Sequence, residues 1–224
     1  RSDDGHSGPT ITKSGEALVT LARGFDQQLA RIRLSDARMT IVGSTPPVVK
    51  AVATNPDQTA FGLLAAERGG VVTVRLADGK LRDPAPVPVP TLQTPEWQPL
   101  HARRLEWVSD NHTIDGLLYL PDGAGPARQV PLVVDVHGGP AGRFEDIDYP
   151  LVRLLLANGW AVLHVNPRGS FGYGTDFLAS LKDDLGGGDY RDIMSGIDVA
   201  IAQAPIDRER LAMIGFSYGG TVVS

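Results

Sequence analysis

A serine between glycines lies in the segment Gly215-Phe216-Ser217-Tyr218-Gly219 of this 224-residue sequence. The segment directly follows an apolar run over residues 211–214, so a strand would lead straight into a sharp turn. Such a turn lifts the hydroxyl clear of a sheet, and bulky side chains two residues to either side would clash, which accounts for the flanking glycines. The hydroxyl could attack an acyl carbonyl and form an acyl-enzyme. The pattern alone also fits a glycine-rich turn with an ordinary surface serine, so the rest of the sequence must decide.

Two more glycine-rich segments follow apolar runs that read as strands. Residues 131–136 lead into His137-Gly138-Gly139-Pro140, and residues 160–165 lead into a glycine-rich stretch over 166–174. In α/β-hydrolases a glycine-rich loop at the first of these places donates a backbone N–H to the oxyanion, and the residue after the nucleophile donates another. We therefore take Ser217 as the candidate nucleophile and the backbone N–H of Tyr218 as one oxyanion donor.

These motifs occur in order and at separations that resemble the catalytic domain of the prolyl oligopeptidase family of serine peptidases. They are the loop 137–140, the stretch 166–174, the segment Gly-Gly-Gly-Asp-Tyr-Arg-Asp over 186–192 and the turn 215–220. The chain is most similar to the acylaminoacyl-peptidase and dipeptidyl-peptidase-like branches. The specific similarity covers residues 100–224, whereas residues 1–100 are similar only in style.

The resemblance implies a serine peptidase that hydrolyses short peptides through an acyl-enzyme on Ser217, as an acylaminoacyl-, dipeptidyl- or oligopeptidase. It also implies that Gly139 supplies the second oxyanion N–H and that Arg168 ties loops together near the site. In prolyl oligopeptidases a tyrosine at the place of His137 serves through its side chain instead. A carboxylesterase or lipase on the same fold, or a non-catalytic homologue, remains an alternative.

The base that a serine nucleophile needs is missing from its usual place. In α/β-hydrolases the triad runs in the order Ser, then Asp or Glu, then His. All five histidines of this sequence precede Ser217, and the seven residues after it include neither an acid nor a histidine. We expect a C-terminally truncated fragment of an active parent, itself inactive because the triad Asp and His are absent.

Three regions follow from the patterns along the chain. Residues 1–83 contain apolar runs at roughly ten-residue spacing, separated by turns, which indicates a sandwich, a barrel or a propeller. A turn such as that over 55–58 suits a four-stranded propeller blade, and the resemblance also implies the end of a β-propeller. Residues 84–99 are rich in proline and predict an extended linker. Residues 100–224 alternate between strands and helices, which predicts the N-terminal part of an α/β-hydrolase domain, a mainly parallel sheet with helices on both faces. The predicted strands of the first region are 17–21, 28–34, 48–53, 60–66 and 71–76; those of the last are 104–108, 114–120, 131–136, 160–165 and 211–214, with helices over 149–158 and 189–204.

The composition of the sequence argues against several other classes of function. The net charge is −5 and no basic run occurs, so we expect no nucleic-acid partner and no membrane partner. The sequence has no cysteine, which excludes disulfides and thiolate metal sites, and it predicts no metal and no cofactor. The acidic residues around 183–192 lack the spacing of a calcium-binding loop. We therefore expect Asp189 to cap the N-terminus of a helix and Asp192 to stabilise that helix through its charge, which interacts favourably with the helix dipole. A homo-oligomer stays open, and the expected location is cytoplasmic, with periplasmic or secreted as the alternative.

Overall fold

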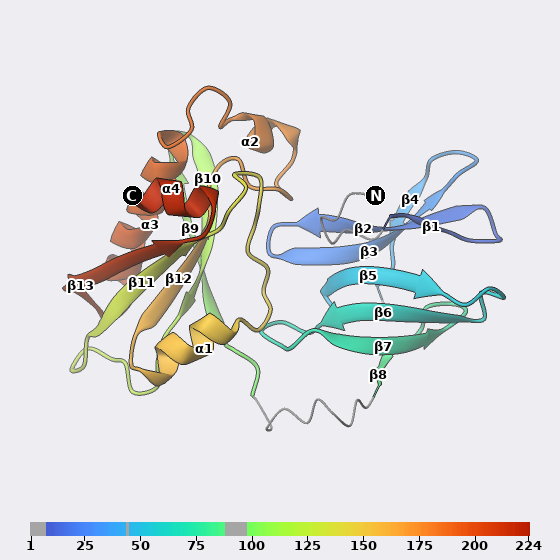
Figure 1. The fold of residues 1–224 in the computed structure, drawn as a ribbon, viewed down its shortest axis with the longest axis horizontal. Coiled ribbons are helices and arrows are strands. Elements are labelled where there is room, and N and C mark those ends of the chain that lie inside the picture. Colours follow the sequence, from blue (N-terminus) through green and yellow to red (C-terminus); the bar gives the residue numbers. More distant parts are fainter. Residues whose placement is uncertain (1–7, 44, 88–97) are drawn as a thin grey trace. The chain divides into compact units, whose positions relative to one another are not determined.

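The computed structural model describes residues 8–43, 45–87 and 98–224. By their internal contacts they form two compact units, coloured in sequence order in Figure 1. The first unit comprises Arg1–Pro99 and the separate segment Glu145–Asp148, and the second comprises Leu100–Phe144 and Tyr149–Ser224. No helix in the described ranges is long and apolar enough to cross a membrane.

The first unit is a sheet of short, mostly antiparallel strands. In the described residues the order is β1-β2-β3-β5-β6-β7-β8, with β4 beside β3. The strands are Thr10–Ile11 (β1), Glu16–Arg23 (β2), Asp26–Arg33 (β3), Met39–Ile41 (β4), Val48–Thr54 (β5), Ala60–Ala66 (β6), Thr73–Asp78 (β7) and Ala85–Pro86 (β8). A single parallel pair, Gln27 with Val48, joins the β1–β4 group to the β5–β8 group. Leu18, Leu29 and Phe61 are buried in the core of this unit.

The five strands predicted for this unit are all present, with ends that differ by up to two residues. The short strands β1, β4 and β8 were not predicted, because two or three residues are too few to show a period. Strand β8 lies inside the range predicted as a linker, where Pro86 occupies the sheet edge that suits a residue without an N–H. The rest of that predicted linker, from residue 88 to 97, lies outside the described residues.

The segment Glu145–Asp148 lies in sequence between the two parts of the second unit but belongs to the first unit by its contacts. Ile147 forms a parallel bridge with Gly70, and the Asp146 N–H donates to the carbonyl of Phe25. The ammonium of Lys50 lies 2.5 Å from the buried carboxylate of Glu145. The sequence prediction assigned these residues to the second domain, since they carry no pattern of their own.

The second unit is built on a five-stranded sheet in the order β13-β11-β12-β10-β9. Its strands are Ala102–Ser109 (β9), His112–Tyr119 (β10), Val130–Val136 (β11), Ala161–Asn166 (β12) and Ile206–Gly215 (β13). Strand β11 runs parallel to both β12 and β13, whereas β10 is antiparallel to β9 and β12. The predicted opening hairpin and the three predicted parallel strands are confirmed.

Helices cover both faces of this sheet (Figure 1). They are Pro150–Ala157 (α1), Thr175–Ala179 (α2), Gly188–Gln203 (α3) and Tyr218–Val223 (α4). Alternate β11 residues, such as Val134, face Ile193 and Ile197 of α3 in the main core. Helix α1 contacts β12 and buries Val152 on the other face. The predicted helices correspond to α1 and α3, and α2 was not predicted because it has only five residues.

Candidate active site

Ser217 occupies a strained turn between β13 and α4. Its backbone lies at φ 56° and ψ −123°, a region that side chains rarely adopt and that tends to persist at working sites. A Cβ added at Gly215 would lie 2.3 Å from the backbone of Gly219, and one added at Gly219 would lie 2.1 Å from the carbonyl oxygen of Val136. Only glycine fits at either position, so the two flanking glycines of the motif are explained by close backbone contacts. Ser217 itself is exposed, as a nucleophile must be.

The glycine-rich loop after β11 lies directly against this serine. The register pairs Val136 with Gly215, so the parallel strands β11 and β13 end side by side. A Cβ placed on Gly138 would lie 3.2 Å from the Ser217 Cβ and 3.8 Å from its Oγ. The two motifs that the sequence separates by about eighty residues therefore meet at one sheet edge, within van der Waals contact.

Both predicted oxyanion donors are available for a ligand. Tyr218 is the first residue of α4, where an N–H has no partner inside the helix. Gly139 is exposed and lies at φ 135°, a conformation that glycine adopts without strain. Within the described ranges neither N–H has a hydrogen-bond acceptor. Their role as the oxyanion hole stays a prediction.

His137 does not offer its side chain to the site. Its Nδ1 lies 2.9 Å from the Gly138 carbonyl oxygen and its Nε2 lies 3.0 Å from the Ser170 hydroxyl. Burial lowers the pKa of His137, so the ring is neutral at pH 7. Since both ring nitrogens are engaged in holding the loop, the backbone route through Gly139 is favoured over a side-chain donor at position 137.

No described histidine is placed to deprotonate Ser217. His112 bonds to the carbonyl of Asp110, and His137 is engaged as above. His101 is exposed at the opposite end of the sheet from Ser217, because the next residue, Ala102, pairs with Tyr119, which pairs with Val162 near the start of β12. His164 is fully buried between the rings of Phe144, Tyr119 and Tyr149, with its ring stacked 3.8 Å from that of Phe144. In the part of the chain that the structure describes, the nucleophile and the loop are therefore present without the base.

The buried His164 makes the stability of the second unit depend on pH. Its Nε2 lies 3.3 Å from the carboxylate of Asp135, yet desolvation outweighs this attraction and lowers the pKa of His164. A histidine whose pKa is lower in the folded protein than in the unfolded chain stabilises the fold at pH values above its pKa in the unfolded chain, about 6.5. This stabilisation is lost as the pH falls towards the pKa of the histidine in the folded protein.

The substitution His164→Phe keeps a ring against Phe144 but removes the group that takes up a proton on unfolding. We expect the unfolding free energy of the variant to fall less steeply below about pH 6.5. The difference in slope should be at most ~1.4 kcal/mol per pH unit, which corresponds to the uptake of one proton. Urea unfolding at pH 5.5, 6.5 and 7.5 would measure it. Some slope should remain, because burial lowers the pKa of His137 as well. Identical slopes for the variant and the wild type would show that His164 titrates normally.

Arg168 ties together the elements behind the site, as the resemblance implied. The guanidinium donates to both carboxylate oxygens of Asp192, at 2.9 and 2.6 Å, and the Arg168 N–H donates to the same carboxylate at 2.8 Å. It also reaches the carbonyl of Ser109. Asp192 is fully buried, so this carboxylate serves the arginine rather than the helix dipole alone.

Gly187 and Gly188, at the N-cap and the first position of α3, allow the first turn of this helix to approach the Arg168 network. A Cβ at Gly188 would lie 2.6 Å from the Arg168 side chain, and one at Gly187 would lie 2.0 Å from the carboxylate of Asp184. The predicted capping role of Asp189 is wrong, since Gly187 occupies the N-cap and no side chain caps the helix. The carboxylate of Asp189 turns instead towards Tyr218, because a stronger donor lies within reach.

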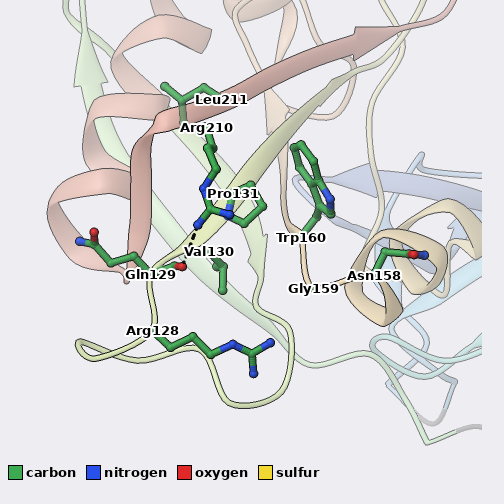
Figure 2. A pocket seen from close by; sticks show the side chains of 9 residues that line it. All are labelled: Arg128, Gln129, Val130, Pro131, Asn158, Gly159, Trp160, Arg210 and Leu211. Carbon is green, nitrogen blue, oxygen red and sulfur yellow. Dashed lines mark hydrogen bonds between the residues drawn. The ribbon is translucent and has the colours of Figure 1, made fainter.

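A separate hollow of about 540 Å³ lies near the amino ends of β11 and β12 (Figure 2), and Ser217 is not among the residues that line it. Arg128, Trp160 and Arg210 line it, and the dashed line in Figure 2 marks the bond from Arg210 to the Gln129 carbonyl. Its lining contains no acid, histidine or serine. The hollow therefore lacks the groups for nucleophilic catalysis, and the candidate site is the edge that holds Ser217.

A strained serine at the end of a parallel strand, with a glycine-rich loop against it, defines the second unit as an α/β-hydrolase domain. The fold of an acylaminoacyl peptidase from Pyrococcus horikoshii, a β-propeller with an α/β-hydrolase, aligns with 97% of this chain and 34% of that one at a TM-score of 0.82 and 23% identity. The predicted fold class, including the propeller strands of the first unit, is confirmed.

The family is found from the sequence of the second unit. Residues 149–224 match the model of the prolyl oligopeptidase family. The acylamino-acid-releasing enzyme of Rattus norvegicus is 35% identical over 106 residues, which are 47% of this chain and 14% of that protein. Dipeptidyl aminopeptidase BIII of Pseudoxanthomonas mexicana is 37% identical over 134 residues, or 56% of this chain and 18% of that protein. The chain spans less than a fifth of the curated relatives that it matches.

Proposed function

We propose that the protein containing this chain is a serine peptidase that hydrolyses short peptides through an acyl-enzyme on Ser217. The observation that carries the proposal is the backbone of Ser217 at φ 56°, which presents an exposed hydroxyl within contact of the 137–140 loop. A serine in an ordinary turn would not need this strain, nor glycines at both flanks.

In the proposed reaction Ser217 Oγ attacks the carbonyl carbon of the scissile peptide bond while its proton passes to a histidine base. The carbonyl π electrons move to the oxygen, and the resulting oxyanion accepts hydrogen bonds from the N–H groups of Tyr218 and Gly139. Collapse of this intermediate breaks the C–N bond, and the amine leaves with the proton. Water then attacks the ester in the same way and releases Ser217.

We propose that the base and its orienting carboxylate come from residues of the protein outside this chain. The relatives are several times longer than the matched segment. Among the described histidines, His112 and His137 are hydrogen-bonded, His164 is buried, and His101 lies at the opposite end of the sheet from Ser217. The chain on its own is then expected to be inactive, because a serine without its base is a poor nucleophile.

Peptides are the proposed substrates because one named relative is, by name, an acylamino-acid-releasing enzyme and the other is a dipeptidyl aminopeptidase. The propeller fold of the first unit also favours peptide substrates, since a propeller accompanies the hydrolase domain in the aligned peptidase. An esterase would use the same serine and the same oxyanion donors. The substrate, and not the nucleophile, therefore distinguishes the two functions.

The test uses the full-length protein that contains this chain. We expect a fluorophosphonate to label Ser217, and the protein to hydrolyse acylated or dipeptidyl anilides in addition to acyl esters of the same side chain. Activity on esters without any on anilides would favour the esterase. A protein that is neither labelled nor active on either substrate would contradict an enzyme of either kind.

A further inference from the structure

We propose that the side chains of Tyr218 and Asp189 form a positioning pair that aims the Tyr218 N–H at the oxyanion. This inference rests on the proposed function and names a further pair of residues for that reaction. Neither side chain needs to touch the substrate, so each is a positioning residue and the backbone N–H is the group that acts.

The pair is joined by a short hydrogen bond across 29 residues of sequence. The Tyr218 hydroxyl donates to the Asp189 carboxylate at 2.5 Å, and the Gly186 N–H donates to the same hydroxyl at 3.0 Å. Asp189 is only 1% exposed, and its second carboxylate oxygen accepts a hydrogen bond from the Tyr190 N–H at 2.9 Å. The phenol thus gives one hydrogen bond and receives another, and together these two bonds fix the position of its hydroxyl.

The hydroxyl of Tyr218 keeps its proton at neutral pH. Burial and, after it, the neighbouring Asp189 raise the pKa of Tyr218 to about 12. A phenol that stays neutral below that pH remains a donor to a carboxylate, and hydrogen bonds to charged groups are the stronger ones. The link between the two side chains is therefore not a pH switch.

The N–H of Tyr218 needs such support because of where it lies. It belongs to the peptide that follows Ser217, so its direction depends on the strained backbone of that serine. A strained conformation persists only when its surroundings hold it, and relaxation here would rotate the peptide away from the oxyanion. Fixing the Tyr218 side chain removes the freedom that this rotation requires.

Asp189 can act as an anchor because its own helix is held. It lies in the first turn of α3, next to Gly188, where an added Cβ would lie only 2.6 Å from the Arg168 side chain. Arg168 in turn is bonded to Asp192, one turn further along the same helix. The first turn of α3 is thus fixed to the strand ends, and the pair passes this rigidity to the residue after the nucleophile.

The test is Tyr218→Phe in the full-length protein, which removes the hydroxyl and keeps the ring. Loss of one oxyanion donor costs about 10²–10³ in kcat, so loosening one should lower kcat by roughly tenfold. KM should stay within about twofold, because the substrate gains this contact mainly in the transition state. Affinity for a peptide aldehyde, whose adduct carries the oxyanion, should fall by the same factor as kcat/KM, whereas binding of the product peptide should not change.

The matched control is Tyr190→Phe, the same change at a neighbouring exposed tyrosine, which should leave kcat and aldehyde affinity as they are. Asp189→Asn keeps an acceptor for the phenol and should lose less than Tyr218→Phe; the Asn variant also covers the case in which the Phe variant fails to fold. An active wild type whose aldehyde affinity is unchanged in both variants would overturn this inference alone. A wild type that is inactive and unlabelled would overturn the proposed function and, with it, this inference.

Discussion

Replacing Ser217 by alanine in the full-length protein is expected to lower kcat for peptide anilides by about 10⁵–10⁶-fold, the loss seen when a serine protease is deprived of its nucleophile. The exposed hydroxyl on the strained turn is the only group of this site that can form the acyl-enzyme. With the hydroxyl gone, the donors at Tyr218 and Gly139 can still bind an oxyanion, so a residual rate above that in water should remain.

Initial rates and fluorophosphonate labelling would measure this effect together. Labelling should disappear in Ser217→Ala and persist in Ser35→Ala, a control at an exposed serine in the turn between β3 and β4. KM should change little, because substrate contacts other than the attack are kept. Full activity in the Ser217 variant would place the chemistry on another residue and contradict the proposed site.

The turn at Ser217 could be predicted because its requirements are local. The strand, the sharp bend and the small flanks all fall within ten residues, and glycine is the only residue that fits beside the backbones of Val136 and Gly219. The loop over 137–140 could be predicted for the same reason, since it directly follows a buried strand. Parallel pairing then brings the two together without any further instruction from the sequence.

The contacts behind the site could not be predicted, because each joins residues whose own surroundings do not indicate a partner. Asp189 reads as a helix cap, since an acid at the start of a helix usually is one, and only the fold shows the Tyr218 hydroxyl within its reach. His164 reads as part of an apolar strand, and its stacking on Phe144 depends on the course of the loop between them. Residues 145–148 likewise show no hydrophobic periodicity that would predict their place in the first unit.

The second large effect concerns Asp192. Asp192→Asn is expected to destabilise the second unit by about 3–5 kcal/mol, because it leaves the buried guanidinium of Arg168 without its charged partner. Arg168 is 5% exposed, and its other carboxylate contact, with Asp110, is longer at 3.3 Å. The exposed pair of Arg210 with Asp207 offers a control, and Asp207→Asn should have little effect on stability.

Denaturant unfolding of the four members of a double-mutant cycle separates the cost of a lone charge from the value of the pair. Arg168→Met combined with Asp192→Asn should recover most of the stability, since the asparagine oxygen can still accept the backbone N–H of residue 168 and no charge stays buried. If the double variant is as unstable as Asp192→Asn, the loss comes from packing rather than from the unpaired guanidinium. A double variant with restored stability but a lowered kcat in the full-length protein would show that the main role of the ion pair is to fix the first turn of α3, and through it Tyr218. Its contribution to the stability of the fold would then be the smaller one.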